Sequence, residues 1–327
     1  MAEKTDWEIP AEARPRPEDY TFDLDRALAS VLRLEAKVPQ DAFSAGTLGT
    51  DRAGNAVLIR DSGLVLTIGY LMSEAETIWL YSSDGRALQG HALAYDYETG
   101  FGLVQALGRL DIPSLALGSA ADLAVGEPVV VGGAGGRRRA LAAQVAARRE
   151  FAGYWEYLLD EAIFTAPAHP QWGGTAVIAR DGLLAGIGSL FVQQSVDGGP
   201  AQDLNMIVPI DALKPALDDL LTYGKVRRPP RPWLGIYAAE ADGRVVVVGL
   251  SPHGPAQQIG VRKGDVILTV GDTEVTTLAD LYRQVWALGA AGVEVPLTLA
   301  RDDRPRLAAI KSADRTQFLK QPRLPQA

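Results

Sequence analysis

Short apolar segments, separated by turns rich in Gly, Asp and Ser, recur in this chain up to about residue 208. In residues 32–38 apolar and charged residues alternate, which is the period-two pattern of a half-buried strand. Residues 56–59 and 64–68 flank the turn 60–63, which is a hairpin signature. Many short strands of this kind predict an all-β barrel or sandwich. Further strand-like segments lie at residues 78–81, 91–95, 102–107, 128–131, 141–145, 176–179, 183–191 and 204–208.

The pattern changes after residue 208. Residues 209–221 place leucines and alanines at helical spacing, and Gly224 is a stop signal for such a helix. A proline- and arginine-rich stretch then follows, of the kind that separates domains. With 327 residues, the chain exceeds what one compact core usually supports. We expect a flexible arm over residues 1–21, a β-rich domain over 22–224, a linker over 225–232, a smaller α+β domain over 233–312 and a tail over 313–327.

Composition limits the classes of function. Hydrophobic residues make up 47% of the chain and charged residues 22%, which is ordinary for a soluble globular protein. The net charge of −8 argues against a nucleic-acid partner, because phosphate binding needs a basic face. The absence of cysteine excludes disulfides, thiolate metal sites and a cysteine nucleophile. No histidine stands at ligand spacing among the carboxylates, so we expect no metal and no cofactor.

The apolar segments are too short for membrane insertion. None approaches the roughly 18–20 residues of a membrane-spanning helix, so we expect no membrane span. The first 20 residues are polar and contain no apolar core of the length that a signal peptide needs. We therefore expect a cytoplasmic protein, with a periplasmic location as the alternative if a leader was removed before Met1.

Three stretches in this order resemble the HtrA/DegP family of chymotrypsin-like serine proteases with C-terminal PDZ domains. Gly-Leu-Val-Leu-Thr at residues 63–67 resembles the strand that leads to the family's catalytic histidine. Met-Ile-Val-Pro at residues 206–209, with the helix after it and Gly-Lys-Val-Arg at 224–227, resembles the end of the protease domain. Trp-Leu-Gly-Ile at residues 233–236 resembles the opening of the PDZ domain. The resemblance implies a mainly β fold, a chymotrypsin-like double β-barrel followed by a PDZ domain, over roughly residues 30–309.

The PDZ resemblance implies a peptide-binding site. Residues 233–236 fit the loop whose backbone N–H groups receive a peptide's terminal carboxylate, with Gly235 allowing close approach. The helical segment over residues 278–286 has an apolar face, part of which would line the peptide groove. The residues we expect to bind peptide are Trp233, Leu234, Gly235, Ile236, Leu281 and Val285.

The residues at the family's catalytic positions cannot perform its chemistry. Counting from the Leu-Thr strand places Tyr70 where the histidine belongs, and a phenol with a pKa near 10 is a poor base. Gly100 stands where the orienting aspartate belongs. In Pro-Gln-Trp-Gly-Gly at residues 170–174, Trp172 takes the place of the serine. Pro170 replaces a glycine whose N–H would bind the oxyanion, and losing one such donor lowers turnover by roughly 10²–10³.

No shift of the alignment restores the site. The sequence has no serine over residues 120–188, and its histidines are few. A pair formed by Thr175 and His169, which lies three residues before Trp172, is the remaining alternative. We expect His169 to make local hydrogen bonds instead. The two other histidines, which we expect to be structural, are His91 and His253.

A glycine-rich stretch at residues 132–136, followed by three arginines, is compatible with a phosphate loop. It lacks the Gly-Lys-Ser/Thr ending of such loops, so we favour a hairpin turn.

We therefore expect a catalytically inactive HtrA-like protein that binds peptide or protein C-termini through its PDZ domain, as a scaffold, a regulator or a holdase. One alternative is an active serine-type endopeptidase with a non-standard site. Another is a structural assembly protein whose PDZ groove is blocked. The resemblance also suggests a homo-trimer, or a hetero-assembly with an active relative, with Trp7, Tyr20 and Phe22 available at a three-fold axis.

Overall fold

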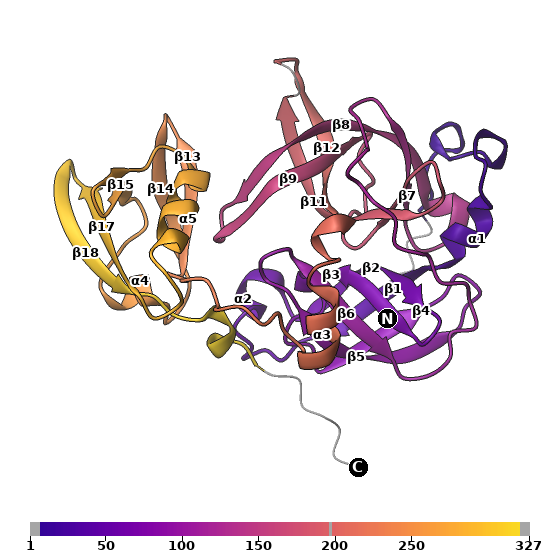
Figure 1. The fold of residues 1–327 in the computed structure, drawn as a ribbon, viewed down its shortest axis with the longest axis horizontal. Helices are drawn as coiled ribbons and strands as arrows, with labels where there is room; N and C mark the ends of the chain where they lie inside the picture. Colours follow the sequence, from indigo (N-terminus) through magenta and orange to yellow (C-terminus); the bar gives the residue numbers. More distant parts are fainter. Residues whose placement is uncertain (1–6, 196–197, 321–327) are drawn as a thin grey trace, which may run out of the picture. The chain divides into compact units, whose positions relative to one another are not determined.

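The computed structural model describes residues 7–195 and 198–320, which form two compact units (Figure 1). The first unit contains the described residues up to 149 together with those of 161–226. The second contains residues 150–160 and 227–320. The tip of one hairpin therefore packs with the C-terminal unit, which the sequence did not predict. No helix among the described residues is long and apolar enough to cross a bilayer.

The first unit begins with a closed antiparallel barrel. Helix α1 (Leu24–Ala29) precedes it, and the side chain of Asp23 caps this helix by accepting the N–H of Arg26. The expected hairpin around the turn 60–63 is confirmed as β2 and β3. The strand order is β1-β2-β3-β6-β5-β4. The strands are β1 (Val31–Lys37), β2 (Asp51–Arg60), β3 (Leu64–Ile68), β4 (Thr77–Tyr81), β5 (Ala87–Tyr95) and β6 (Phe101–Ala106).

A second closed barrel completes the first unit, with the order β10-β11-β12-β9-β8-β7. The expected helix after residue 208 is shorter than predicted, because Ile210–Ala212 form a 3-10 turn before α3 (Leu217–Tyr223). Gly224 ends α3 in the left-handed conformation, as its position predicted. The strands are β7 (Pro128–Gly132), β8 (Ala140–Gly153), β9 (Tyr157–Ala166), β10 (Ala176–Ile178), β11 (Leu184–Ser195) and β12 (Ala201–Pro209), of which β9 was not predicted.

The C-terminal domain is a sheet ordered β13-β14-β15-β17-β18, with β16 paired to β15. The amphipathic helix expected over residues 278–286 is α5 (Leu278–Ala287), which begins with a capping box between Thr277 and Asp280. The mainly β fold class is confirmed. The remaining elements are β13 (Ile236–Ala241), β14 (Arg244–Leu250), α4 (Pro255–Gln258), β15 (Val266–Val270), β16 (Thr273–Glu274), β17 (Glu294–Arg301) and β18 (Arg304–Lys311).

Both expected terminal segments are packed where the structure describes them. Ile9 is only 3% exposed in the core of the second barrel, and its N–H bonds the carbonyl of Arg138 at 2.9 Å. Residues 7–21 are therefore not a free arm, whereas residues 1–6 lie outside the described residues. In the expected tail, Ala313 pairs with Trp233, and the ring of Phe318 lies 4.9 Å from that of Trp233. Both segments are packed, contrary to the expectation, because burying their apolar side chains is favourable.

The glycine-rich stretch forms the turn between β7 and β8, as expected. The N–H of Gly133 bonds the carbonyl of Arg139 at 2.9 Å. Arg137 pairs with Asp25 at 2.8 Å, and Arg138 pairs with Glu8 at 3.1 Å. These arginines balance local carboxylates.

Replacing the buried Ile9 by alanine tests whether residues 7–21 belong to the core. Ile9→Ala should lower the free energy of unfolding by about 3 kcal/mol, because the cavity term adds to the lost transfer energy. Urea unfolding of the whole chain measures this change. The matched control is Leu107→Ala, because Leu107 is 57% exposed. Equal midpoints for the two variants would contradict the packing of this segment.

Candidate functional site

Tyr70 lies in the 3-10 turn Gly69–Leu71 that follows β3, and its hydroxyl faces the second barrel. It donates a 2.8 Å hydrogen bond to the carbonyl of Ser189 on β11. Ser189 falls at an irregularity in the pairing of β11 with β12, so its main chain needs a partner outside the ladder. Burial raises the pKa of Tyr70 well above its ordinary value, although a hydrogen bond from the Trp172 side chain acts in the opposite direction. The phenol therefore stays protonated at neutral pH.

The side chain of Trp172 lies within hydrogen-bonding reach of Tyr70, so the two residues assigned to the nucleophile and base positions lie side by side. Its ring packs 5.5 Å from that of Phe191. The carbonyl of Trp172 accepts bonds from the N–H of Thr175 at 3.2 Å and from its hydroxyl at 2.9 Å. The buried Thr175 hydroxyl is thus directed at main chain. An indole has no nucleophilic atom that could replace a serine hydroxyl.

His169 is fully buried and serves its own loop. Its Nδ1 accepts the N–H of Gln171 at 3.1 Å, which leaves Nε2 to donate to the carbonyl of Arg139 at 2.9 Å. The side chain of Asn205 accepts the main-chain N–H of His169 at 2.6 Å. Burial lowers the pKa of His169, so the ring is neutral. Both ring nitrogens are therefore occupied by main-chain groups rather than by Thr175.

Gly100 ends a tight turn and carries no side chain toward Tyr70. Its φ of +88° is a conformation that favours glycine, and its carbonyl accepts the N–H of Gly69 at 2.7 Å. Asp96, in the same turn, accepts the hydroxyl of Thr99 at 2.8 Å and the N–H of Glu98 at 3.2 Å. That carboxylate holds its own turn together.

Asn55, on β2, is a structural residue of this site that the sequence analysis missed. Its Nδ2 donates to the carbonyls of Gln171 at 2.9 Å and Gly173 at 3.1 Å. Its Oδ1 accepts the N–H of Ala134 at 2.9 Å, and its own N–H bonds the Gly173 carbonyl at 2.8 Å. The available signal was a single amide inside an otherwise apolar strand segment, which becomes informative only when its partners are known.

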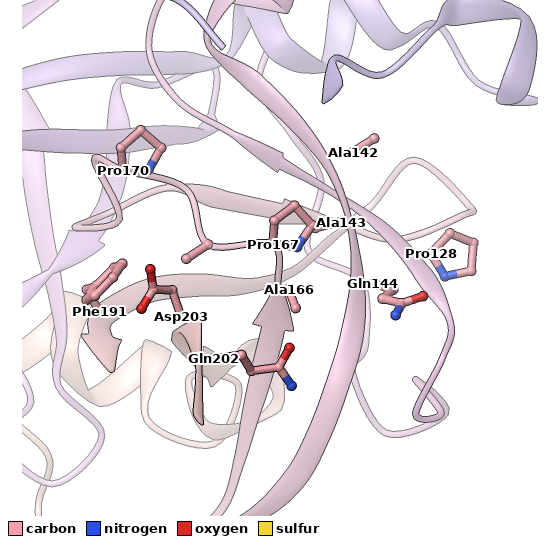
Figure 2. Close-up of a pocket in the computed structure, with 11 residues that line it drawn as sticks. Pro128, Ala142, Ala143, Gln144, Ala166, Pro167, Pro170, Phe191, Gln202 and Asp203 are labelled. Atoms are coloured by element: carbon pink, nitrogen blue, oxygen red, sulfur yellow. The ribbon is translucent and has the colours of Figure 1, made fainter. Parts of the chain in front are cut away.

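A surface pocket of about 880 Å³ lies beside this loop (Figure 2). Pro170 and Phe191 lie on one side of it and Pro128 on another. Its polar lining comes from the side chains of Gln144, Gln202 and Asp203. Apart from Phe191, the other residues that line it are alanines and prolines, and none of the lining residues offers a hydroxyl, thiol or imidazole. The pocket therefore adds no catalytic group to the site.

The expected carboxylate-binding loop already holds a carboxylate, from Glu156 at the tip of the β8–β9 hairpin. The N–H groups of Leu234, Gly235 and Ile236 bond Glu156 Oε1 at 3.3, 2.7 and 3.0 Å. The N–H of Leu234 also reaches Oε2 at 3.0 Å. Gly235 has a φ of +75°, which turns successive N–H groups toward one point. The loop thus has the geometry to bind a carboxylate.

The other expected peptide-binding residues divide into two groups. Leu281 and Val285 on α5 are each 2% exposed and belong to the same apolar cluster as Leu158 of the hairpin. Trp233 instead faces Phe318 and pairs its main chain with Ala313. The indole is thus part of the packing against the C-terminal segment, and the role of Trp233 in peptide binding stays a prediction.

The charge of Glu156 is set by two opposing effects. Desolvation raises its pKa to about 7, although the bonds from Leu234, Ile236 and Gly235 and the nearby Arg315 all favour the ionised form. The hydroxyl of Tyr282 accepts the Glu156 N–H at 3.3 Å and donates to the carbonyl of Gly153 at 2.6 Å. Burial, with the Glu156 charge as a second cause, raises the pKa of Tyr282, so its hydroxyl remains a donor.

Comparison with known proteins agrees with this architecture. Residues 54–187 match the trypsin-like peptidase domain, and residues 232–311 match the PDZ domain. Solved structures with similar folds include the serine endoprotease from Yersinia pestis (21% identity, TM-score 0.51, 88% of this chain and 95% of that one). Another is the HtrA-type protease AlgW with a decapeptide (20% identity, TM-score 0.52, 92% and 98%).

Curated relatives match this chain at low identity. A probable periplasmic DegP-like serine endoprotease of Pseudomonas fluorescens is 25% identical over 77% of this chain, which spans 54% of that relative. The serine endoprotease DegS of Salmonella typhimurium is 22% identical, with 88% of this chain and 84% of the relative covered. A DegP-like relative from Halomonas elongata is also named as periplasmic. The expected cytoplasmic location finds no support among these relatives.

Removing the Tyr70 hydroxyl should destabilise the first unit. Tyr70→Phe leaves the Ser189 carbonyl without this donor, so we expect a loss of about 1–3 kcal/mol in the free energy of unfolding. Urea denaturation followed by tryptophan fluorescence measures it. Tyr223→Phe is the control because Tyr223 is 51% exposed. A Tyr70→Phe variant as stable as this control would rule out a structural role for the hydroxyl.

The raised pKa of Glu156 gives a pH dependence with a defined sign. Between its ordinary 4.5 and about 7, the folded state holds a proton that the unfolded state releases. The free energy of unfolding should therefore fall as pH rises through this window, by at most about 3 kcal/mol, and should level off above it. Urea unfolding of the wild type and Glu156→Gln at pH 5, 6, 7 and 8 isolates the effect. Parallel pH profiles for the two proteins would contradict it.

Proposed function

We propose that this HtrA-family serine protease homologue, which joins a trypsin-like domain to a PDZ domain, does not cleave peptide bonds and instead binds peptide or protein C-termini. In this role it acts as a scaffold, a regulator of an active relative or a holdase. The observation that carries the proposed inactivity is the contact between Trp172 and Tyr70, at the positions where the resemblance places the family's serine and histidine.

The chemistry of these two residues supports inactivity. Serine-protease chemistry needs a hydroxyl nucleophile beside an imidazole that takes its proton. Here an indole lies beside a protonated phenol, whose hydroxyl is already bonded to Ser189. Neither side chain exchanges a proton readily near neutral pH.

The remaining two positions support the same proposal independently. Pro170 has no N–H, so it cannot bind an oxyanion where the family's glycine does. Gly100 supplies no carboxylate, and Asp96 is bonded within its own turn. Restoring any single group would therefore leave three defects in place.

Binding of C-termini is supported by the loop at residues 234–236. Three N–H groups converge on one carboxylate there, and charge-assisted bonds of this kind are stronger than neutral ones. Helix α5 packs against the adjacent strand β13, and a PDZ domain accepts a peptide as a strand added to an exposed sheet edge.

The second candidate function is an active serine-type endopeptidase of the same family, and the curated relatives named as endoproteases favour it. The two candidates differ in whether any hydroxyl reacts covalently. A fluorophosphonate probe labels an activated serine and therefore separates them.

Wild-type protein should show neither fluorophosphonate labelling nor casein cleavage above a buffer blank. An active HtrA-type protease, assayed in parallel, confirms that the reagents work. Trp172→Ser should also remain unlabelled, because Tyr70, Gly100 and Pro170 are unchanged. Labelling of the wild type, or casein cleavage that the probe abolishes, would establish the endopeptidase instead.

A further inference from the structure

We propose that the tip of the β8–β9 hairpin, residues 153–158, is a built-in ligand of the PDZ groove, so that an external C-terminus must displace it to bind. This inference rests on the proposed function, because it assumes that the groove accepts C-termini. We call residues 153–158 the tip segment.

The carboxylate of Glu156 occupies the position in which the loop would hold a peptide's terminal carboxylate. Its bonds to Leu234, Gly235 and Ile236 are between 2.7 and 3.3 Å long. A carboxylate at these N–H groups and a second carboxylate from a peptide would share the same donors and repel each other. The two are therefore mutually exclusive.

The main chain of the tip segment also imitates a bound peptide. The carbonyl of Tyr154 accepts the N–H of Ala238 on β13 at 3.0 Å. A peptide that adds to a sheet edge as a strand makes this type of main-chain bond. The ring of Tyr154 lies 5.9 Å from that of Tyr237, in an edge-on arrangement. The tip segment thus uses the strand edge as well as the carboxylate loop.

An apolar side chain is the third feature that the tip segment shares with a bound peptide. Leu158 is 8% exposed and belongs to the core cluster that contains Leu234, Ile236, Leu281 and Val285. Peptide ligands combine main-chain bonds, which give affinity, with side-chain pockets, which give specificity. Because a leucine fits among these residues, we expect displacing C-termini to end in an aliphatic or aromatic residue.

The backbone at Glu156 indicates that its contacts outweigh local preference. The turn between β8 and β9 spans residues 154–156, and Glu156 has a φ of +60°. Three-residue hairpin turns favour glycine at such a left-handed position. A glutamate there disagrees with the local rule, and residues that break local rules are concentrated at functional sites.

The flanks of the tip segment are held by contacts that can open. Arg283 on α5 pairs with Glu150 on β8 and with Asp160 on β9. Its side chain is 49% exposed and that of Asp160 is 84% exposed, and ion pairs of this exposure contribute little. The groove therefore remains accessible to a competitor, whose apparent dissociation constant is the intrinsic constant divided by the fraction of open molecules.

The test measures peptide affinity with and without the Glu156 carboxylate, in the full chain at pH 8. The probes are fluorescein-labelled hexapeptides with free C-termini that end in Leu, Val, Ile or Phe, and the same peptides amidated. Fluorescence polarisation should show Glu156→Ala binding at least one free-carboxylate probe about tenfold more tightly than the wild type, with the amidated probes weak for both. Glu156→Gln, which keeps the side chain's shape, should lie between them or match Glu156→Ala.

The matched control is Glu161→Gln, because Glu161 lies on β9, the strand that follows Glu156, but pairs with Arg148. It should bind the probes as the wild type does. Amide hydrogen exchange gives a second readout, in which Glu156→Ala should increase the exchange of Gly235, Ile236 and Ala238 about tenfold. Loss of the fold would instead increase exchange throughout the second unit, and Glu156→Gln then supplies the comparison.

The outcomes separate the two proposals. Equal, tight binding of free-carboxylate probes by wild type and both Glu156 variants would overturn the built-in ligand and leave C-terminal binding standing. No binding by any of the proteins, with exchange at the loop increased in the variants, would overturn C-terminal binding and with it the competition proposed here. Tighter binding by Glu161→Gln to the same degree would show a general charge effect and would also overturn the built-in ligand.

Discussion

The hydrogen bonds of Asn55 hold the loop that contains Trp172. One side chain on the first barrel bonds the carbonyls of Gln171 and Gly173 in the second, and the N–H of Ala134 as well. None of these bonds depends on the side chain at position 172. The loop is therefore shaped by buried polar contacts that remain whether or not a serine is present. The reactive group and the conformation of the loop are separable here, because different residues supply them.

The same separation applies to His169. Because histidines are few in this chain, the position of His169 three residues before Trp172 raised the possibility of catalysis. Its two ring nitrogens instead bond main-chain groups, and its main chain bonds Asn205. A buried imidazole used in this way fixes the direction of the loop. A residue with catalytic potential thus serves packing, while Tyr70 and Trp172 hold the positions that we propose to have lost the catalytic groups.

Much of the fold could be predicted from local patterns. Apolar segments on either side of a turn located the β2–β3 hairpin. Helical spacing located α5, because this helix has one buried face. Strand β9 was not predicted because Asp160 and Glu161 interrupt an apolar run, so that neither a helical nor a strand periodicity is clear. The packing of Ile9 was not predicted for another reason. A segment rich in proline and charged residues gives no indication that one isoleucine is buried in a core formed by distant residues.

The site was predicted less completely than the fold, and the reason is physical. Tyr70 and Trp172 could be paired from motif spacing alone, whereas Asn55 and Glu156 act through partners more than 70 positions away. Turn rules predict glycine at position 156 and give no reason to expect a carboxylate bonded to main-chain N–H groups there. Such long-range polar contacts become visible only once the backbone has brought the partners together.

The Glu156 carboxylate belongs to a side chain of the same molecule as the groove, whereas the carboxylate of an outside peptide lies at a chain end. A tethered competitor has a local concentration fixed by the geometry of its hairpin, and dilution of the protein leaves that concentration unchanged. The threshold concentration of outside chain needed to occupy the groove would then be set within each molecule. It would be the same at low and at high concentrations of this protein. Single substitutions along the hairpin would move this threshold without altering the surface that the outside chain contacts.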